Sequence, residues 1–504
     1  MHGSRSPTPD VVKGFSREED GMRPNVTHVA AAVILMSLLQ AGCGGAGGGG
    51  AGGGGSGGPE APPSQPAYSY SFVAPTYVVG VAIVPNLPTV GQGKATTFTV
   101  SPALPSGLRL DSVTGVIDGT PTVTWPFTPY LVKASSPAGS MTAALGIAVR
   151  AAGTFRPAAE TAIPRDGHTS TLLGNGQVLV AGGALTSDPA NPGVYDPKSG
   201  VFTPAPMPAE IFDPVAGTWS PTPRMFAARW AHAATLLRDG RVLVTGGVGY
   251  ETLEFWDPVA STEIFDPATG TWSPAAPMHT PRYFHAAVAL PDGRVLVSGG
   301  WAQVFSEASV EIYDPAADAW TLAPGMHAAR VGHTATLLPD GRVLVVGGLG
   351  DEGWPLAAEL FDEASGGWSV TAGELGRARA SHSAVALPDG HVLVASGIDP
   401  SGAELSAPEI FVPATGMFRA SPGGGASRAG PAVLLPDGTV LAAFGNHAGS
   451  SRTAEILDPA SGGWAPTDDP KMWRPGVPRA TPLRDGSVLF TGGGVAASEV
   501  FSVP

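Results

Sequence analysis

Arginine and histidine recur together along the last two-thirds of the chain, three residues apart, and could support binding or catalysis. The arginines are Arg165, Arg229, Arg282, Arg330, Arg379 and Arg428, and the histidines that follow most of them are His168, His232, His285, His333 and His382. A guanidinium can bind anionic groups, and an imidazole can act as a general acid or base. The pattern recurs in repeats, however, and a single active site needs no such copies. We therefore expect most of the histidines to hydrogen-bond the backbone of a neighbouring repeat and most of the arginines to bridge repeats.

Aromatic residues that do not repeat are better indicators of a binding surface. They lie between the repeated strands, where loops are expected, and loops carry a large share of binding residues. These segments contain Phe226, Trp230, Tyr250, Phe255, Trp256, Tyr283, Phe284, Trp301, Phe305, Trp354 and Trp473. Arginine combined with aromatic side chains makes a good recognition surface for protein or sugar. The candidate binding residues are Arg229, Arg282, Arg330, Arg379, Tyr250, Trp256, Tyr283, Trp301 and Trp354.

The sequence contains none of the common catalytic or metal-binding motifs. It has no H-E-x-x-H metal-binding motif and no phosphate-binding loop. Nor do its serine, histidine and aspartate residues follow the order along the chain that is typical of hydrolases with a catalytic triad. Its single cysteine, Cys43, excludes an internal disulfide and a cysteine-based metal site. With 28 basic and 42 acidic residues, the chain lacks the excess of positive charge that nucleic-acid binding requires. We expect no catalytic residues, no metal, no cofactor and no nucleic-acid partner.

The N-terminal region has the features of a targeting signal. Residues 29–39 form an apolar run that is too short to span a bilayer as a helix but suits the core of a signal peptide. The run is followed by Q-A-G-C, ending in Cys43, which resembles a bacterial lipoprotein signal. The resemblance implies that Cys43 is lipidated and anchors the chain in the cell envelope, and Gly44 after it favours the outer membrane. Met22, followed by an arginine, is the expected start of translation.

A linker and a small domain follow the signal region, which covers residues 1–43. Residues 44–60 are glycine-rich and are expected to be a flexible linker, because glycine loses the most backbone entropy on ordering. Residues 61–150 contain short β-rich segments separated by proline and glycine, a pattern typical of a β-sandwich. The segment LPSGLRLDSVTGVIDGTPT, residues 104–122, resembles the immunoglobulin-like domains of bacterial surface proteins. The resemblance implies a spacer or adhesion module, and we interpret Asp111 and Asp118 as turn residues.

Residues 151–504 consist of repeats at intervals close to 48 residues. The glycine of a P-D-G-like turn recurs at Gly176, Gly240, Gly293, Gly341, Gly390, Gly438 and Gly486. Each copy has an apolar strand, this turn, a second apolar strand that ends in most copies in paired glycines, a variable loop and an outer hairpin that carries an aromatic residue. Asp-Gly supplies the positive φ that a hairpin turn needs. Four short strands per copy predict a β-propeller blade.

The paired glycines, followed by an aromatic residue, resemble the kelch repeat and the bacterial relatives of the central domain of galactose oxidase. The matching pairs are Gly182-Gly183, Gly246-Gly247, Gly299-Gly300, Gly347-Gly348 and Gly492-Gly493. The resemblance implies an all-β chain with a seven-bladed kelch-type β-propeller after the immunoglobulin-like β-sandwich. Galactose oxidase also needs a copper-radical site with a tyrosine crosslinked to cysteine. The propeller here contains no cysteine, so that site cannot be assembled.

Two further expectations concern the ends of the propeller. The last copy has only three strands, and residues 153–157 align with the missing fourth strand, so these residues should close the ring. The first copy carries two outer hairpins, at 194–202 and 211–219, of which one is an insertion that the sequence does not identify.

We expect a monomeric, non-enzymatic lipoprotein of the cell envelope, held at the outer membrane by lipidated Cys43, whose propeller loops bind a protein or glycan partner. One alternative is a carbohydrate-active enzyme on a galactose oxidase-like scaffold that lacks the copper-radical site. Another is a purely structural spacer.

Overall fold

The computed structural model of the chain is all-β. It describes residues 68–71, 76–83, 85–89, 97–137, 139–183, 194–196, 201–203, 208–249, 257–421, 430–444, 453–459, 463–474, 476 and 478–503, with only the backbone for 76, 194–196 and 201–203. The predicted signal region, Cys43, the glycine-rich linker, Tyr250 and Trp256 lie outside these residues. Within the described ranges no helix has the length and hydropathy needed to cross a membrane.

The first described part is a small β-sandwich. Its main sheet has the order β2-β8-β7-β4, with β2 parallel to β8 and the other pairs antiparallel. A core that includes Phe98, Ile117, Tyr130 and Ile147 joins this sheet to two hairpin-like pairs. Asp111 accepts two backbone N–H groups in a turn, as expected. Asp118 instead lies on strand β6, opposite Arg109, with which it forms an ion pair at 2.6 Å, so its interpretation as a turn residue was wrong. The strands are β1 (Ser69–Tyr70), β2 (Thr76–Val78), β3 (Pro88–Thr89), β4 (Thr97–Ser101), β5 (Leu108–Leu110), β6 (Ile117–Gly119), β7 (Trp125–Ser136) and β8 (Gly139–Arg150).

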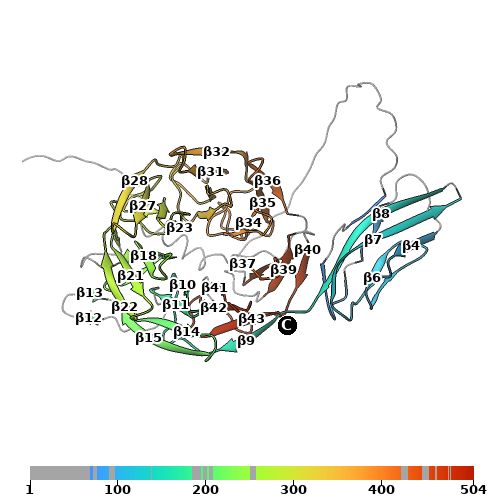
Figure 1. The fold of residues 1–504 in the computed structure, drawn as a ribbon, viewed down its shortest axis with the longest axis horizontal. Coiled ribbons are helices and arrows are strands. Elements are labelled where there is room, and N and C mark those ends of the chain that lie inside the picture. Colours follow the sequence, from blue (N-terminus) through green and yellow to red (C-terminus); the bar gives the residue numbers. More distant parts are fainter. Residues whose placement is uncertain are drawn as a thin grey trace, which may run out of the picture. The chain divides into compact units, whose positions relative to one another are not determined.

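Seven four-stranded antiparallel sheets account for most of the remaining described chain, and these are the blades of a propeller (Figure 1). The innermost strands are β10 (Thr169–Leu172), β17 (Ala233–Leu236), β23 (Ala286–Ala289), β29 (Thr334–Leu337), β33 (Ser383–Ala386), β37 (Ala432–Leu434) and β41 (Pro478–Pro482). The second strands are β11 (Val178–Ala181), β18 (Val242–Thr245), β24 (Val295–Ser298), β30 (Val343–Val346), β34 (Val392–Ala395), β38 (Val440–Ala443) and β42 (Val488–Gly492).

The outer half of each blade is a hairpin. The third strands are β14 (Pro208–Asp213), β21 (Thr262–Asp266), β27 (Val310–Asp314), β31 (Ala357–Asp362), β35 (Glu409–Val412), β39 (Ala454–Asp458) and β43 (Ser498–Ser502). The outer strands are β15 (Thr218–Arg224), β22 (Thr271–Ala275), β28 (Ala319–Ala323), β32 (Gly367–Glu374), β36 (Met417–Ala420), β40 (Gly463–Pro466) and β9 (Thr154–Ala158).

The blades form a closed ring. Each innermost strand contacts the innermost strands of the two neighbouring blades, and β10 contacts both β17 and β41. The N-terminal strand β9 supplies the outer strand of the last blade, where Phe155 lies opposite Phe501 on β43. This pairing confirms the predicted closure. It covers the edge of β43, which would otherwise be open for pairing with another chain.

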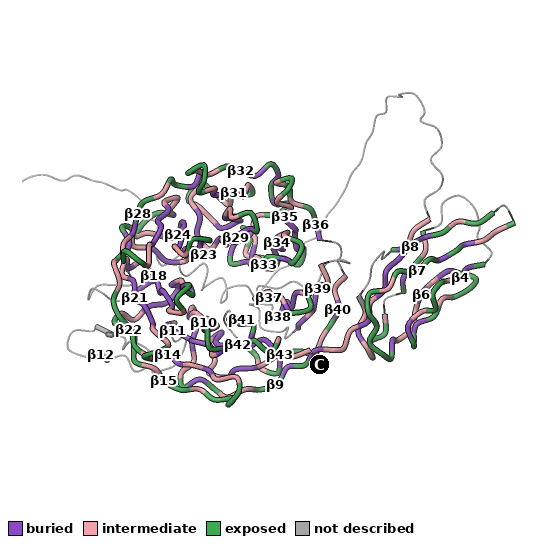
Figure 2. Tube along the Cα trace, viewed as in Figure 1, coloured by how far each residue is buried: buried purple, intermediate pink, exposed green. Residues whose placement is uncertain are grey.

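The second strand of each blade is buried on both faces. In β30 all four residues, Val343–Val346, are buried, as the continuous apolar run predicts. The paired glycines then bring neighbouring blades together. A Cβ on Gly347 would lie 2.4 Å from the carbonyl oxygen of Arg379 in the next blade, and Gly347 has a φ of 63°. A Cβ at Gly347 would therefore require the backbone of Arg379 to shift. Figure 2 shows this burial inside the blades and the exposure of their turns.

The structure identifies the insertion in the first blade. β14 and β15 complete its four-stranded sheet, whereas β12 (Val194–Asp196) and β13 (Val201–Thr203) pair only with each other. The hairpin at 194–202 is therefore the insertion. Short additional pairs lie in other loops of the propeller: β16 (Arg229–Trp230), β19 (Val248–Gly249), β20 (Asp257–Pro258), β25 (Trp301–Ala302) and β26 (Phe305–Ser306).

Candidate functional site

Two kinds of connection leave each blade at the same end. One joins the second strand to the third, and the other joins the outer strand to the next blade. We call this end the loop face, and the end with the short Asp-Gly turns the turn face. All candidate binding residues lie in loop-face segments of the sequence.

The repeated arginines are buried beneath the loop face. In Arg330, Nη1 donates to the carbonyl oxygen of Gly347 at 2.9 Å, and Nη2 lies 3.0 Å from Glu359 Oε1 on the third strand of the same blade. Both side chains are 1% exposed. The same pairing occurs in Arg165–Glu210, Arg229–Glu263, Arg282–Glu311, Arg379–Glu409 and Arg474–Glu499.

This geometry places the four candidate binding arginines inside the propeller, beneath its loop face. Arg229, Arg282, Arg330 and Arg379 point into their own blades, and each is at most 2% exposed. Nor do their side chains bridge blades. The contact between blades comes from the backbone instead; for example, Gly300 N–H donates to the carbonyl oxygen of Arg330 at 2.8 Å. The glutamate partner recurs in the third strands, so the sequence did contain a signal for this pairing, which our prediction did not use.

The electrostatics of the pairs agree with a structural role. Burial lowers the pKa of Arg282 from its ordinary value, and the charge of Glu311 opposes that shift. Burial alone would raise the pKa of Glu311, but the N–H groups of His279 and Thr280 and the Arg282 guanidinium together hold it below its ordinary value. The Glu311 carboxylate is therefore ionised and accepts hydrogen bonds from several donors of the chain, which leaves it little capacity for a ligand.

The repeated histidines connect neighbouring blades. His333 Nε2 shares a hydrogen bond of 2.9 Å with Ser298 Oγ in the preceding blade, and His382 makes the same contact with Thr334. The partner is thus a side-chain hydroxyl, not the backbone that the sequence led us to expect. Burial lowers the pKa of His333 and of His382 to about 3, so both rings are neutral near pH 7. The equivalent pairs are His168–Thr491, His232–Thr169 and His285–Thr245.

Two of the candidate aromatic residues lie together and are largely buried. The backbones of Tyr283 and Trp301 exchange hydrogen bonds, and their side chains are 6% and 8% exposed. Tyr283 also contacts the rings of Trp230 and Phe284. Burial raises the pKa of Tyr283 to about 12, so its hydroxyl stays protonated. Trp354, in another loop, is partly exposed.

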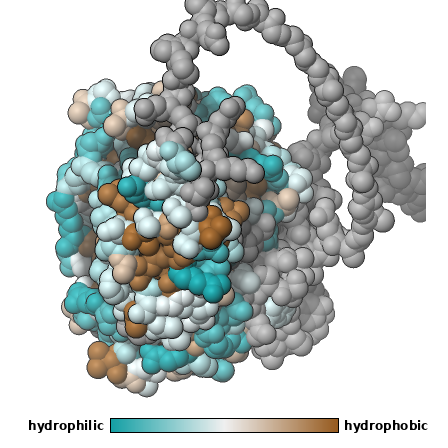
Figure 3. Space-filling model, turned by 90° about the vertical axis from the view of Figure 1, so that its right-hand side faces the viewer, coloured by the Kyte–Doolittle hydropathy of each residue, from teal (hydrophilic) through white to brown (hydrophobic). Residues whose placement is uncertain are grey.

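Other loop-face aromatics are more accessible than Tyr283, Trp301 and Trp354, the candidate aromatics that the structure describes. The exposed fractions of Phe226, Phe305 and Trp473 are 67%, 65% and 52%. None of these residues recurs at the same position in every blade. Figure 3 shows one side of the molecule, where hydrophobic side chains gather in a patch among polar ones. Among the described residues no group of three histidine, cysteine, aspartate or glutamate side chains is placed to hold a metal ion.

Comparison with known proteins supports the fold. The family described as "Putative Ig domain" matches residues 60–150, and the kelch motif matches residues 229–279 and 281–327. No curated protein matches the chain. One solved structure is described as a novel fungal alcohol oxidase with catalytic diversity among the AA5 family, in complex with copper. It is 19% identical, covers 70% of this chain and 76% of its own, and has a TM-score of 0.54.

At that identity the likeness concerns the fold alone. The matched segments cover the sandwich and two consecutive repeats of the propeller, and the architecture of the remaining repeats follows from the sheet topology. The chain is thus an immunoglobulin-like domain followed by a β-propeller that carries kelch motifs.

Proposed function

We propose that this chain is a non-enzymatic lipoprotein of the cell envelope whose loop face binds a protein or glycan partner. The observation that carries the proposal is a division among the loop-face residues. Those that recur, such as Arg330 and His333, are buried and hydrogen-bonded within the propeller. Aromatic residues that do not recur, Phe226, Phe305 and Trp473, are left exposed. Solvent-exposed aromatic side chains contribute little to folding and are frequent anchors of interfaces.

The residues present do not fit a copper site of the galactose oxidase type. The repeat histidines are committed to hydroxyl groups of the preceding blades, for example His333 to Ser298. The single cysteine, Cys43, precedes both domains. We therefore favour binding over the alternative of a carbohydrate-active enzyme, because the residues that the structure describes contain no equivalent set of copper donors.

The proposal is tested by measuring binding with and without the exposed aromatics. The purified full-length chain in detergent is applied to a glycan array and, after photo-crosslinking, to envelope extracts. A variant with Phe226→Ala, Phe305→Ala and Trp473→Ala should bind the captured ligands at least about tenfold more weakly. The loss of even one interface anchor costs about 2 kcal/mol of binding free energy. The matched control is Val215→Ala, which changes a side chain that is 97% exposed on the turn face. Equal binding by both variants would contradict the assignment of the loop face.

A further inference from the structure

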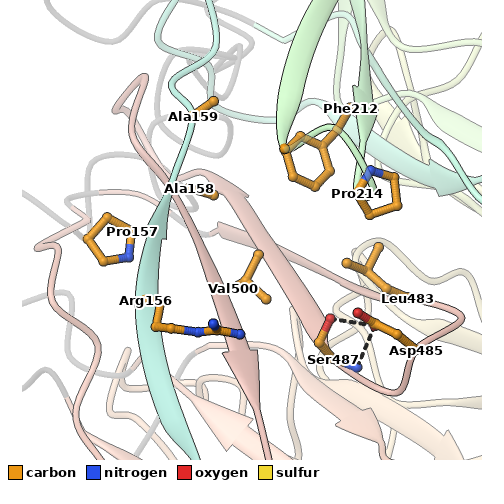
Figure 4. A pocket seen from close by; sticks show the side chains of 11 residues that line it. Arg156, Pro157, Ala158, Ala159, Phe212, Pro214, Leu483, Asp485, Ser487 and Val500 are labelled. Carbon is orange, nitrogen blue, oxygen red and sulfur yellow. Dashed lines mark hydrogen bonds between the residues drawn. The ribbon is translucent and has the colours of Figure 1, made fainter.

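A hollow lies at the seam where the last blade meets the first. Its volume is about 360 Å³, and it opens near the turn face (Figure 4). Asp485 and Ser487 of the last blade line one side, and Pro214 of the first blade lies opposite. Val500 and Leu483 add apolar walls. Arg156 enters from β9.

Other blades show what the equivalent space normally contains. In the second, third and fourth blades the residue after the Asp-Gly turn is an arginine that binds back to the turn aspartate. Arg241 Nε donates to Asp239 at 2.7 Å, and Arg342 Nε donates to Asp340 at 2.9 Å. The carboxylate at this turn therefore holds a guanidinium in these blades.

The third blade shows how far this guanidinium reaches. Arg294 pairs with Asp292 of its own turn and also with Glu363 in the outer turn of the next blade. Glu363 follows the last residue of its third strand, as Pro214 follows β14 in the first blade. The Arg294 side chain thus spans the space that is hollow at the seam.

In the last blade the arginine is replaced by a serine. The backbone N–H and the hydroxyl of Ser487 both donate to Asp485 Oδ1, at 3.0 and 2.6 Å. Within the described residues Asp485 Oδ2 has no hydrogen-bond or ion-pair partner. These hydrogen bonds, with a smaller contribution from the charge of Arg156, hold the pKa of Asp485 below its ordinary value, so the carboxylate is charged near pH 7. The turn keeps its acceptor but lacks the cation found in three other blades.

The sixth blade shows that this cation can come from outside the turn. Its turn aspartate, Asp437, is followed by Thr439 instead of arginine. There Arg150, distant in sequence, brings its Nη1 to 3.2 Å from Thr439 Oγ1 and 3.9 Å from Asp437 Oδ2. In a turn that lacks its own arginine, an arginine from another segment of the chain thus lies beside the turn aspartate.

We propose that the hollow at the seam binds a guanidinium group supplied by another molecule, with Asp485 as its anionic acceptor. A planar guanidinium fits the apolar walls and can donate two hydrogen bonds to Asp485 Oδ2, as Arg342 Nε and Nη2 both donate to Asp340 Oδ2. An ammonium group offers only a point charge. The group is either a free arginine-like compound or an arginine side chain of a protein partner. This site is on the turn face and is independent of the proposed loop-face function.

Arg156 is the nearby cation that could compete with such a ligand. Its Nη2 donates to Ser502 Oγ at 3.3 Å, and no ion pair joins it to Asp485 among the described residues. The aligned residue of the second blade is Ser273. Removing the positive charge of Arg156 should therefore strengthen binding of a guanidinium, because two like charges would no longer approach each other.

The test is a titration of the full-length chain with methylguanidinium and with two capped tripeptides, Ala-Arg-Ala and Ala-Lys-Ala, by calorimetry at low salt. We expect the arginine peptide to bind at least about tenfold more tightly than the lysine peptide. Arg156→Ser should raise the affinity several-fold. Asp485→Asn should lower it by about tenfold or more, since a charge-assisted hydrogen bond becomes a neutral one. Asp389→Asn, in the fifth-blade turn where His391 binds the aspartate, is the matched control and should change nothing.

Ser487→Arg supplies a second readout that does not depend on a ligand. It restores the arginine of the other blades, so it should abolish binding and raise Tm by about 1–2 °C, the size expected of an exposed ion pair. A peptide affinity at least tenfold above that of methylguanidinium would assign the site to a polypeptide partner, and similar affinities would assign it to a small molecule. Absence of arginine-selective binding to the native chain, or equal effects of Asp485→Asn and Asp389→Asn, would overturn the proposal.

Discussion

Replacing Glu359 by alanine should lower the free energy of unfolding of the propeller by about 3–5 kcal/mol, because it leaves the Arg330 guanidinium buried without its counter-ion. Both side chains are 1% exposed, and the two charged atoms lie 3.0 Å apart. The carboxylate also accepts the backbone N–H groups of His327 and Ala328. Since each hydrogen bond to a charged group contributes about 1.5–3 kcal/mol, losing several of them supports an effect of this size.

Two further variants separate burial from charge. Arg342→Ala breaks an ion pair with Asp340 in which the side chains are 31% and 45% exposed, and it should cost less than about 1 kcal/mol. The double variant Arg330→Met with Glu359→Leu removes both buried charges and should recover most of the loss, because no unpaired charge remains.

The assay is urea unfolding followed by tryptophan fluorescence, with the free energy extrapolated linearly and the m value compared between variants. A loss below about 1 kcal/mol for Glu359→Ala, or a double variant as unstable as the single one, would refute the reasoning. Either result would mean that water reaches the pair, and Arg330 would again be a candidate for binding a ligand.

Three other outcomes are expected. The pKa of His333 is about 3 in the folded chain but about 6.5 when unfolded, so the unfolded state binds more protons between these values. Stability should fall as pH drops from about 7 toward 3, and His333→Asn should show a shallower slope in unfolding midpoint against pH. Deleting residues 153–158 removes β9 and should lower Tm sharply; an unchanged melting curve would contradict closure. Cys43→Ser should move the protein from the membrane to the soluble fraction of the expressing bacterium, while N-terminal sequencing of the precursor should find Met22 first.

The fold could be predicted from the sequence because the same short pattern had to satisfy the same geometry in every blade. Asp340-Gly341 forms the turn of one hairpin. Gly347 lies so close to the backbone of the neighbouring blade that a Cβ would clash with it. Where the pattern weakens, the backbone keeps its conformation. Ser396 and Phe444 take φ values of 64° and 59°, which glycine takes in other blades. The packing of neighbouring blades therefore outweighs the local preference of these two residues.

The site was harder to predict, because residue type does not reveal which way a side chain points. Arg330 stands beside a loop in the sequence, yet its side chain turns inward to a glutamate on the third strand. The partner is 29 residues away and becomes visible only when the repeats are aligned. Tyr283 and Trp301 are loop aromatics whose backbones pair with each other and whose side chains are buried instead of facing solvent. Phe226 and Trp473, equally present in the sequence, remained exposed.

Departures from a repeat are informative when the partner of the missing group is still present. In the first blade the turn holds Asn175 and Gln177, which hydrogen-bond each other, so both the acid and its cation are gone. In the sixth blade Asp437 remains and Arg150 approaches it. In the last blade Asp485 remains charged and lines a hollow whose equivalent in the third blade holds the Arg294 guanidinium. Because an exposed carboxylate remains hydrated, leaving Asp485 without a counter-ion costs the fold little stability. The same carboxylate is therefore available to a guanidinium ligand.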